Sequence, residues 1–294
     1  MMTTARRDLP VTQTINGERI VLLGWSRAIL LQLAHPLVAA AVAEHSSFRS
    51  GQFAPLRRLG HTVRAMLAIT FGDSVSRSAA IHAIQSIHRR VHGALTTSVG
   101  PWPIGTPYSA EDPALLLWVH LTLVQSMVIT YESIVSPLTD AQRDAYCAET
   151  AGTAVELGVD AAAVPCRWSE LEDGLQRSYA SGEICVGAEA RHLAATILSP
   201  PLGWWAWPGL ALNRIITLGL LPSDVRSQYG LEWDEAHDRS FRRCCGALAR
   251  GRKAAPAALA LWRDYRRLVK HDVVAAPAGA MNGPRGEPRG RILP

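Results

Sequence analysis

Apolar side chains recur every three or four residues over most of this 294-residue chain, which is the spacing of amphipathic helices. No stretch alternates apolar and polar residues over the roughly four to eight positions that predict a strand. The pattern therefore predicts an all-α fold, built as a single large helical domain. We expect helices over residues 27–33, 59–71, 80–93, 113–135, 139–157, 169–180, 188–198, 210–218, 222–228, 235–250 and 257–270.

Local signals mark several helix ends. Pro36 either kinks the helix that precedes it or starts the next one. Ser109, Asp112 and Pro113 form a capping arrangement for the helix that follows. The sequence from Thr139 to Gln142 has the spacing of a capping box, and Gly158 is placed to end that helix.

Composition excludes some classes of protein. Hydrophobic residues make up 48% of the chain and charged residues 19%, which is enough apolar surface for a full core. The net charge is +5, and 28 of the 30 basic residues are arginine, the exceptions being Lys253 and Lys270. No basic run is interleaved with aromatic residues, so we expect no nucleic-acid partner. The excess charge is interpreted as solvated faces together with a clamp for an anionic group or surface.

The N-terminal sequence and the cysteines indicate the compartment. Basic residues near the N-terminus are not followed by the apolar core of a signal peptide, which predicts a cytoplasmic protein. The five cysteines are odd in number and share no metal-site spacing, so we expect reduced thiols. Two apolar segments, 20–43 and 202–221, are interrupted by polar residues and favour buried core helices, with peripheral membrane contact left open.

We divide the chain by composition into three parts. Residues 1–20 form an N-terminal segment and residues 21–272 the folded domain. Residues 273–294 are rich in glycine, proline and arginine, and we expect a disordered tail there. The sequence carries no signal for an oligomeric state.

A histidine lies on the apolar face of the predicted helix over residues 80–93. At helical spacing His88 shares that face with Ile81, Ile84 and Val91, and His92 would follow one turn later at its edge. A neutral imidazole aimed into an apolar interior suits an axial ligand of haem iron. It is equally the pattern of a core histidine that is hydrogen-bonded to a neighbour.

Other polar residues occupy helices that should be buried. Arg58, His61 and Thr62 fall at i, i+3 and i+4 and so share one side of their helix. Glu44, near the end of an apolar helix, either faces the interior or belongs to a solvated last turn. His120 lies on the inward face of the 113–135 helix, where we favour a hydrogen-bonded core histidine over direct ligation.

These segments together resemble the haem-dependent oxygenase family that includes MpaB and the latex clearing protein, a rubber oxygenase. The resemblance runs from about residue 24 to residue 230. It is carried by LLGWSRAILLQLAHPLVAAAVAEHSSF, RRLGHTVRAMLAITFGD, IHRRVHG, YSAEDPALLLWVH and YESIVSPLTDAQRDAY.

The resemblance implies an all-helical domain that encloses a haem b pocket, with His88 as the proximal, iron-binding ligand. The family's Arg-x-x-Lys-Thr element is similar to Arg58, His61 and Thr62, and its acidic residue, a candidate base, is similar to Glu44. The lysine position is His61 here, so the group over the distal face is not a lysine.

The resemblance also implies a reaction. Haem delivers O2 to an apolar, unsaturated substrate, which we expect to be small or medium-sized because the chain lacks an evident extension of the kind found in rubber-cleaving members. Arg58 would pair with a haem propionate, because arginine binds carboxylates through two parallel hydrogen bonds. His92 and His120 are further candidates for contact with the cofactor.

Two other functions compete with this one. A haem carrier or sensor would use the same pocket without turnover if His61 closed the sixth coordination position. A non-haem iron site would use Glu44, His88 and His92, although the paired Glu-x-x-His pattern of ferritin-like sites is missing from the sequence.

Overall fold

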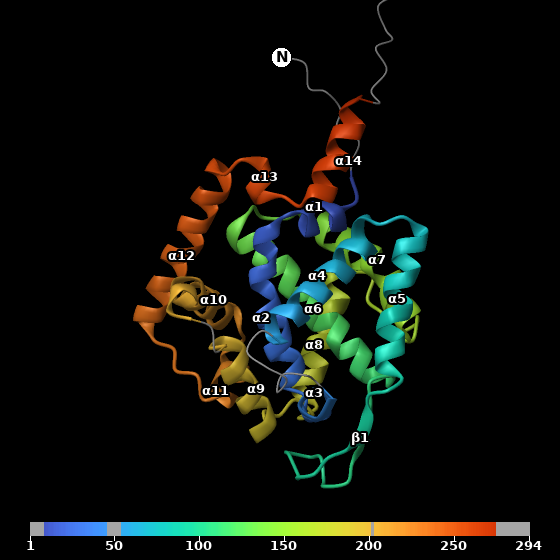
Figure 1. The fold of residues 1–294 in the computed structure, drawn as a ribbon. Helices are drawn as coiled ribbons and strands as arrows, with labels where there is room; N and C mark the ends of the chain where they lie inside the picture. Colours follow the sequence, from blue (N-terminus) through green and yellow to red (C-terminus); the bar gives the residue numbers. More distant parts are fainter. Residues whose placement is uncertain (1–8, 46–53, 201–202, 275–294) are drawn as a thin grey trace, which may run out of the picture.

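A computed structural model of the protein describes residues 9–45, 54–200 and 203–274, apart from the side chains of 54–59 and 271–274. Within these ranges it confirms the all-α prediction, since the chain folds into helices joined by short connections and one small hairpin (Figure 1). The predicted disordered tail lies outside the described residues from 275 onward. The elements in chain order are α1 (Val11–Gly17), η1 (Arg19–Leu22), α2 (Leu23–Leu33), α3 (Pro36–His45), α4 (Ala54–Phe71), α5 (Ser74–His88), β1 (His92–Ala94), β2 (Pro107–Ser109), α6 (Pro113–Ile134), α7 (Asp140–Leu157), α8 (Trp168–Ala180), α9 (Ala188–Leu198), η3 (Trp204–Ala206), α10 (Trp207–Leu220), α11 (Ser223–Gln228), α12 (Glu235–Ala254), α13 (Ala257–Ala260) and α14 (Arg263–Val274).

Helix α6 runs through the centre of the molecule and packs along α2 (Figure 1). The two backbones approach closely where α2 begins, because Gly24 has no side chain there. A Cβ atom on Gly24 would lie 2.3 Å from the hydroxyl oxygen of Thr130 and 2.9 Å from the carbonyl oxygen of Ser126. A glycine at this position therefore sets the distance between the two central helices.

A buried arginine links α2, α6 and α10. Arg27 is 2% exposed, and its guanidinium donates to the Leu220 carbonyl (2.7 Å), the Ser126 hydroxyl (2.6 Å) and the Gln125 amide oxygen (2.8 Å). Burial lowers the pKa of Arg27 to about 10, so the side chain stays charged near neutral pH. The charged residue that interrupts the apolar segment 20–43 is thus part of the core.

The chain turns sharply between α2 and α3. The axes of Arg19–Leu33 and Pro36–His45 differ by 109°, so Pro36 starts a new helix and does not kink an existing one. Helix α6 is long and apolar enough to cross a membrane by length and composition, but 61% of its most apolar window is buried inside the protein. That burial is what the core helix of a helical domain requires.

Local capping signals give the helix ends that the sequence predicts. Asp112 caps α6 by accepting the Ala114 backbone N–H at 2.8 Å. Thr139 and Gln142 form the expected capping box of α7. Gly158 ends α7 with φ of 112°, a left-handed conformation that favours glycine.

The structure adds detail near the N-terminus and differs from the sequence prediction at two helices. Helix α1 and the first half of η1 lie in residues 1–20, which we assign to an N-terminal segment. The predicted helix over 257–270 is divided into α13 and α14, because Leu261 pairs with Glu18 and the Trp262 N–H donates to the Gly17 carbonyl. The helix expected over 80–93 ends at His88.

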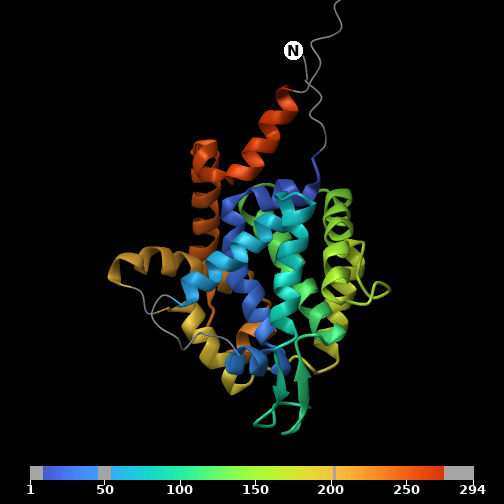
Figure 2. The ribbon, with the colours of Figure 1, turned by 45° about the vertical axis from the view of Figure 1, so that its right-hand side comes forward.

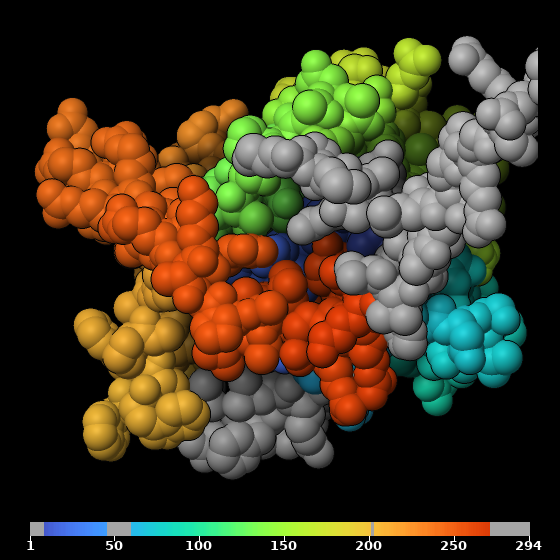
Figure 3. Space-filling view, turned by 90° about the horizontal axis from the view of Figure 1, so that it is seen from above, coloured from blue at the N-terminus to red at the C-terminus, as the bar shows by residue number. Residues whose placement is uncertain are grey.

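Helices lie on both sides of the α2–α6 centre. In Figure 1, α5 is on one side, α10 and α12 are on the other, and α4 crosses in front of the centre, while α14 extends from one end. The hairpin of β1 and β2 extends from the opposite end (Figure 2). Seen from the α14 end, the segment that includes η3 and the start of α10 stands out from the body (Figure 3).

Candidate functional site

Two helices that diverge from a tight turn carry most of the predicted site. Gly72 and Asp73 separate α4 from α5, and Asp73 caps α5 by accepting the Ser76 N–H at 2.8 Å. From this turn the two helices spread apart (Figures 1 and 2). The beginning of α4 and the end of α5 therefore lie at the open end of the pair.

His88 is the last residue of α5 at this open end. Its side chain is half-buried, and its Nδ1 is buried with no hydrogen-bond partner among the described residues. Burial lowers the pKa of His88, and the negative charge of Glu111 offsets part of that change. The imidazole is therefore neutral at physiological pH and has an unpartnered nitrogen.

Apolar residues lie near His88 along α5, and one apolar residue of α6 is exposed. Ile84 lies one turn earlier on the same face and is half-buried, while Ile87 is exposed. On α6, Leu123 is 40% exposed although its neighbours Thr122 and Val124 are buried. Packing thus leaves apolar surface uncovered on both helices.

His120 lies on α6 one turn before Leu123. Its Nε2 is buried and has no hydrogen-bond partner among the described residues. Burial lowers the pKa of His120 to about 4, so this imidazole is also neutral. The prediction that His120 is a hydrogen-bonded core histidine is therefore not borne out for Nε2.

Glu44 belongs to a polar cluster at the end of α3. The Tyr108 hydroxyl donates a short hydrogen bond to Oε2 of Glu44 and lies 3.5 Å from Nε2 of His45. Tyr108 is 4% exposed, and its burial together with the Glu44 hydrogen bond raises its pKa. Glu44 is an exposed residue, as a solvated last turn requires, but one of its carboxylate oxygens is held by the protein.

A glycine makes room for this cluster beside the connection that follows α5. A Cβ atom on Gly93 would lie 2.5 Å from the Tyr108 hydroxyl oxygen and 3.1 Å from Oε2 of Glu44. Gly93 is in β1, and it pairs with Tyr108 of β2. The short hairpin thus brings a buried phenol to a carboxylate that is distant in sequence.

The polar group on α4 is less buried than the sequence predicts. His61 and Thr62 are exposed, and the side chain of Arg58 lies outside the described residues. None of the residues from Gly60 to Phe71 is fully buried. The expectation of three polar groups on a buried helix is wrong for His61 and Thr62.

His92 is not on the same helix as His88. It is exposed in β1, and its carbonyl oxygen lies 3.1 Å from Nε2 of His45. The i, i+4 pair of imidazoles that the sequence predicts does not form, because α5 ends at His88 and the chain pairs as a strand. In the described part of the chain, no three His, Cys, Asp or Glu side chains are grouped to hold a metal ion. The hypothesis of a non-haem site with Glu44, His88 and His92 is therefore not supported.

The described residues fit a haem b group better than a bare metal ion. A neutral imidazole with an unpartnered nitrogen is what an axial ligand of haem iron requires, and the exposed apolar side chains on α5 and α6 offer surface of the kind that packs against a porphyrin. This fit rests on His88, Ile87 and Leu123.

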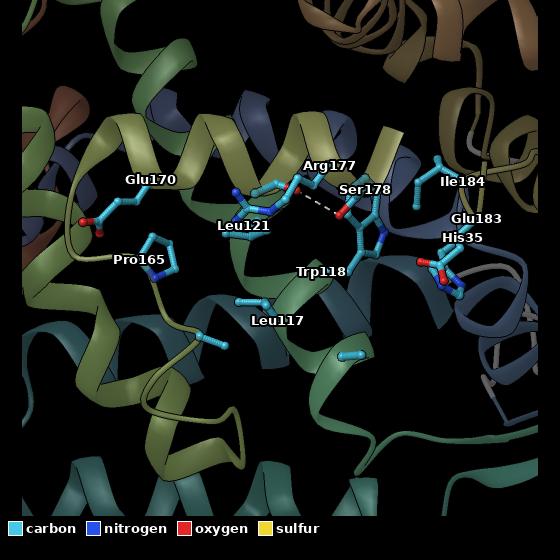
Figure 4. A pocket seen from close by; sticks show the side chains of 13 residues that line it. His35, Leu117, Trp118, Leu121, Pro165, Glu170, Arg177, Ser178, Glu183 and Ile184 are labelled. Carbon is cyan, nitrogen blue, oxygen red and sulfur yellow. Dashed lines mark hydrogen bonds between the residues drawn. The ribbon is translucent and has the colours of Figure 1, made fainter. Parts of the chain in front are cut away.

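Sequence reasoning missed a hollow on the other side of α6. It has a volume of about 200 Å³ and lies between α6, α8 and the segment that precedes α9 (Figure 4). Its walls include apolar Leu117, Trp118 and Ile184, and polar Arg177. None of the predicted site residues lines it.

His35 also borders this hollow. It is 5% exposed, and its Nδ1 accepts the Leu37 N–H at 3.3 Å. Burial lowers the pKa of His35 to about 4. In the sequence, His35 is distinguished only by its position before a proline within an apolar run. That position did not predict its place beside the hollow.

Comparison with known proteins gives the family. Residues 12–250 match the family described as ER-bound oxygenase mpaB/B′/rubber oxygenase, catalytic domain. The chain is also similar to an uncharacterised protein of Mycobacterium bovis and to one of Mycobacterium tuberculosis. Each is 30% identical over 223 residues, which cover 72% of this chain and 81% of the relative. No solved structure gives a significant match.

Proposed function

Because this chain belongs to the family of ER-bound oxygenase mpaB/B′ and rubber oxygenase catalytic domains, and so has an oxygenase-type function, we propose that it is a haem b-dependent oxygenase. The observation that supports the proposal best is the neutral, half-buried His88 with its unpartnered nitrogen. Its partners would be O2 and a small or medium, apolar, unsaturated molecule. When bound, the haem supplies the redox chemistry that activates O2.

The chain's own residues would hold and orient the cofactor. His88 would be the proximal ligand, and Ile84, Ile87 and Leu123 would pack against the porphyrin. The propionates need cations at the edge of the site, and Arg58 on α4 is our candidate, because a guanidinium binds a carboxylate through two parallel hydrogen bonds. His120 would contact the cofactor from α6.

Glu44 is the residue we propose to move a proton. Its Oε2 accepts the Tyr108 hydroxyl, and Oε1 accepts no hydrogen bond within the described residues. Oε1 is therefore the oxygen that would take a proton from the substrate, with Tyr108 fixing its direction. His61 and Thr62, which are exposed on α4, would line the distal side as hydrogen-bonding groups.

Haem binding tests the proximal ligand. The full chain is purified with haem supplied, and haem per protein is measured from the Soret band. We expect His88→Ala to retain little haem while keeping its helical circular dichroism. His82→Ala is the matched control, because His82 is exposed on the same helix, and it should bind haem like the wild type, while His92→Ala and His120→Ala should keep most of it. Wild-type haem content in His88→Ala would show that the ligand is another residue.

The role of His61 separates an oxygenase from a haem carrier or sensor. We expect the reduced, haem-loaded wild type to bind carbon monoxide rapidly, because an oxygenase must bind a gas at its haem. His61→Leu should also bind the gas. A wild type that refuses carbon monoxide, beside a His61→Leu variant that takes it, would favour the carrier or sensor.

A further inference from the structure

Three tryptophans gather on the surface where α10 begins. Trp204 is 91% exposed, Trp205 65% and Trp207 71%. The other six tryptophans of the chain are buried or half-buried. Leaving three indole rings in water is unfavourable for a protein surface, so such a patch indicates a binding partner.

The helix that presents these rings is anchored in the protein at its other end. Ile216, Thr217 and Leu218 of α10 are buried, and Asn213 exchanges hydrogen bonds with Ser26 of α2 at 3.1 and 3.3 Å. The start of the helix, by contrast, stands out from the body of the molecule (Figure 2). The tryptophans are therefore carried on a convex projection that is held by the core.

The segment of chain around the patch carries no acidic residues. Residues 190–223 contain no aspartate and no glutamate, but they include Arg191 and Arg214. Arg214 is exposed two helical turns after Trp207, with exposed Ala211 between them, so all three lie on one face of α10. Because an α-helix rises about 1.5 Å per residue, Arg214 lies about 10 Å from Trp207 along the helix axis.

We propose that the start of α10 docks this protein on the surface of a lipid bilayer that carries anionic lipid. Tryptophan prefers the headgroup level, because its ring is apolar and its N–H forms a hydrogen bond with the interface. Arg214 then lies within reach of lipid phosphates. A convex projection can enter the headgroup layer of a bilayer, which deforms around it. The inference is independent of the haem assignment.

Vesicle binding of the full chain tests the proposal. The protein is mixed with vesicles of phosphatidylcholine and phosphatidylglycerol, or of phosphatidylcholine alone, and the bound fraction is measured by flotation. We expect the wild type to bind the anionic vesicles, and the triple variant Trp204→Ser, Trp205→Ser, Trp207→Ser to bind at least about tenfold more weakly. Arg214→Gln should lose about fivefold on anionic vesicles only.

A matched control removes apolar surface elsewhere. Val75, Ile104 and Leu259 are exposed to a similar degree, and their triple serine variant should bind like the wild type. Brominated lipid should quench the tryptophan fluorescence of the wild type but not that of the tryptophan variant.

Three outcomes would overturn the proposal. One is a wild type that binds neither vesicle, and another is a tryptophan variant that binds like the wild type. The third is a wild-type dimer in sedimentation velocity that the tryptophan variant converts to a monomer, which would make the patch an interface between copies. Haem content is measured on the same samples, so loss of membrane binding is distinguishable from failure of the haem proposal.

Discussion

The α2–α6 centre and the diverging α4–α5 pair are built differently. Helix α2 buries seven of its eleven residues, whereas α5 buries only Ile81 of its fifteen. In the centre, the guanidinium of Arg27 has an acceptor for each nitrogen. On the pair, His88 keeps a buried nitrogen without a partner among the described residues, as does His120 on α6, while the unpartnered group at the α2–α6 contact is the hydroxyl of Thr130, a weaker ligand than an imidazole.

This difference indicates that the two regions have different roles. Buried polar groups in most proteins are hydrogen-bonded, so an unpartnered one needs an explanation, such as a bound water, an ion, a cofactor or strain. The well-packed centre therefore provides the free energy of folding, and the less covered pair retains groups for binding. Substitutions in the two regions should affect different measurements.

The largest effect on stability should come from Arg27 in the centre. Arg27→Ala removes three hydrogen bonds and leaves a cavity, and we expect it to lower the free energy of unfolding by about 3–5 kcal/mol. Urea denaturation measures the loss, and Arg64→Ala, an exposed arginine on α4, should change it little. A loss in Arg27→Ala no larger than that of Arg64→Ala would contradict the role given to the centre.

Acidification should weaken the fold through His35. Burial lowers the pKa of His35 from 6.5 to about 4, so below pH 6.5 the unfolded chain binds a proton that the folded chain does not. The stability contribution is complete above pH 6.5 and decreases as the pH falls toward 4, by up to about 3 kcal/mol. His120, whose pKa is also lowered to about 4, acts in the same direction.

Urea denaturation across this pH range measures the effect, with His35→Asn as the comparison. Asparagine can still accept the Leu37 N–H but does not titrate, so the variant should lose less stability on acidification than the wild type. An unchanged pH profile would show that His35 is not the group responsible.

A pair of tyrosines should give the smallest stability change and the sharpest contrast. Both are buried, but Tyr229 donates to the Leu30 carbonyl (2.7 Å) in the centre, and Tyr108 donates to Glu44 near the candidate site. Tyr229→Phe should lower the free energy of unfolding by about 1–2 kcal/mol and leave oxygen uptake with an unsaturated hydrocarbon unchanged.

Tyr108→Phe should show the opposite pattern. Glu44 is exposed and can be hydrated, so the stability loss should be about 1 kcal/mol or less, while oxygen uptake should decrease on the order of tenfold because the carboxylate is no longer oriented. Equal effects of the two substitutions on both measurements would show that the regions are not distinct in function.

The sequence by itself determined the helical class, most helix ends in the middle of the chain and the family. Thr139 with Gln142, Asp112 and Gly158 act through hydrogen bonds to backbone groups within a few residues, so their effect can be predicted without the fold. The family motifs are likewise continuous stretches of sequence.

Only the tertiary structure decided which polar groups meet. Tyr108 donates to Glu44 across 64 residues, and this contact exists because β1 pairs with β2 and Gly93 leaves room for the phenol. The same pairing stops α5 at His88, since backbone groups that enter a ladder cannot continue a helix. Hydrophobic periodicity predicts which face of a helix is buried. Long-range strand pairing, by contrast, determines that α5 ends at His88. It also determines that the carboxylate of Glu44 lies beside the strand that follows.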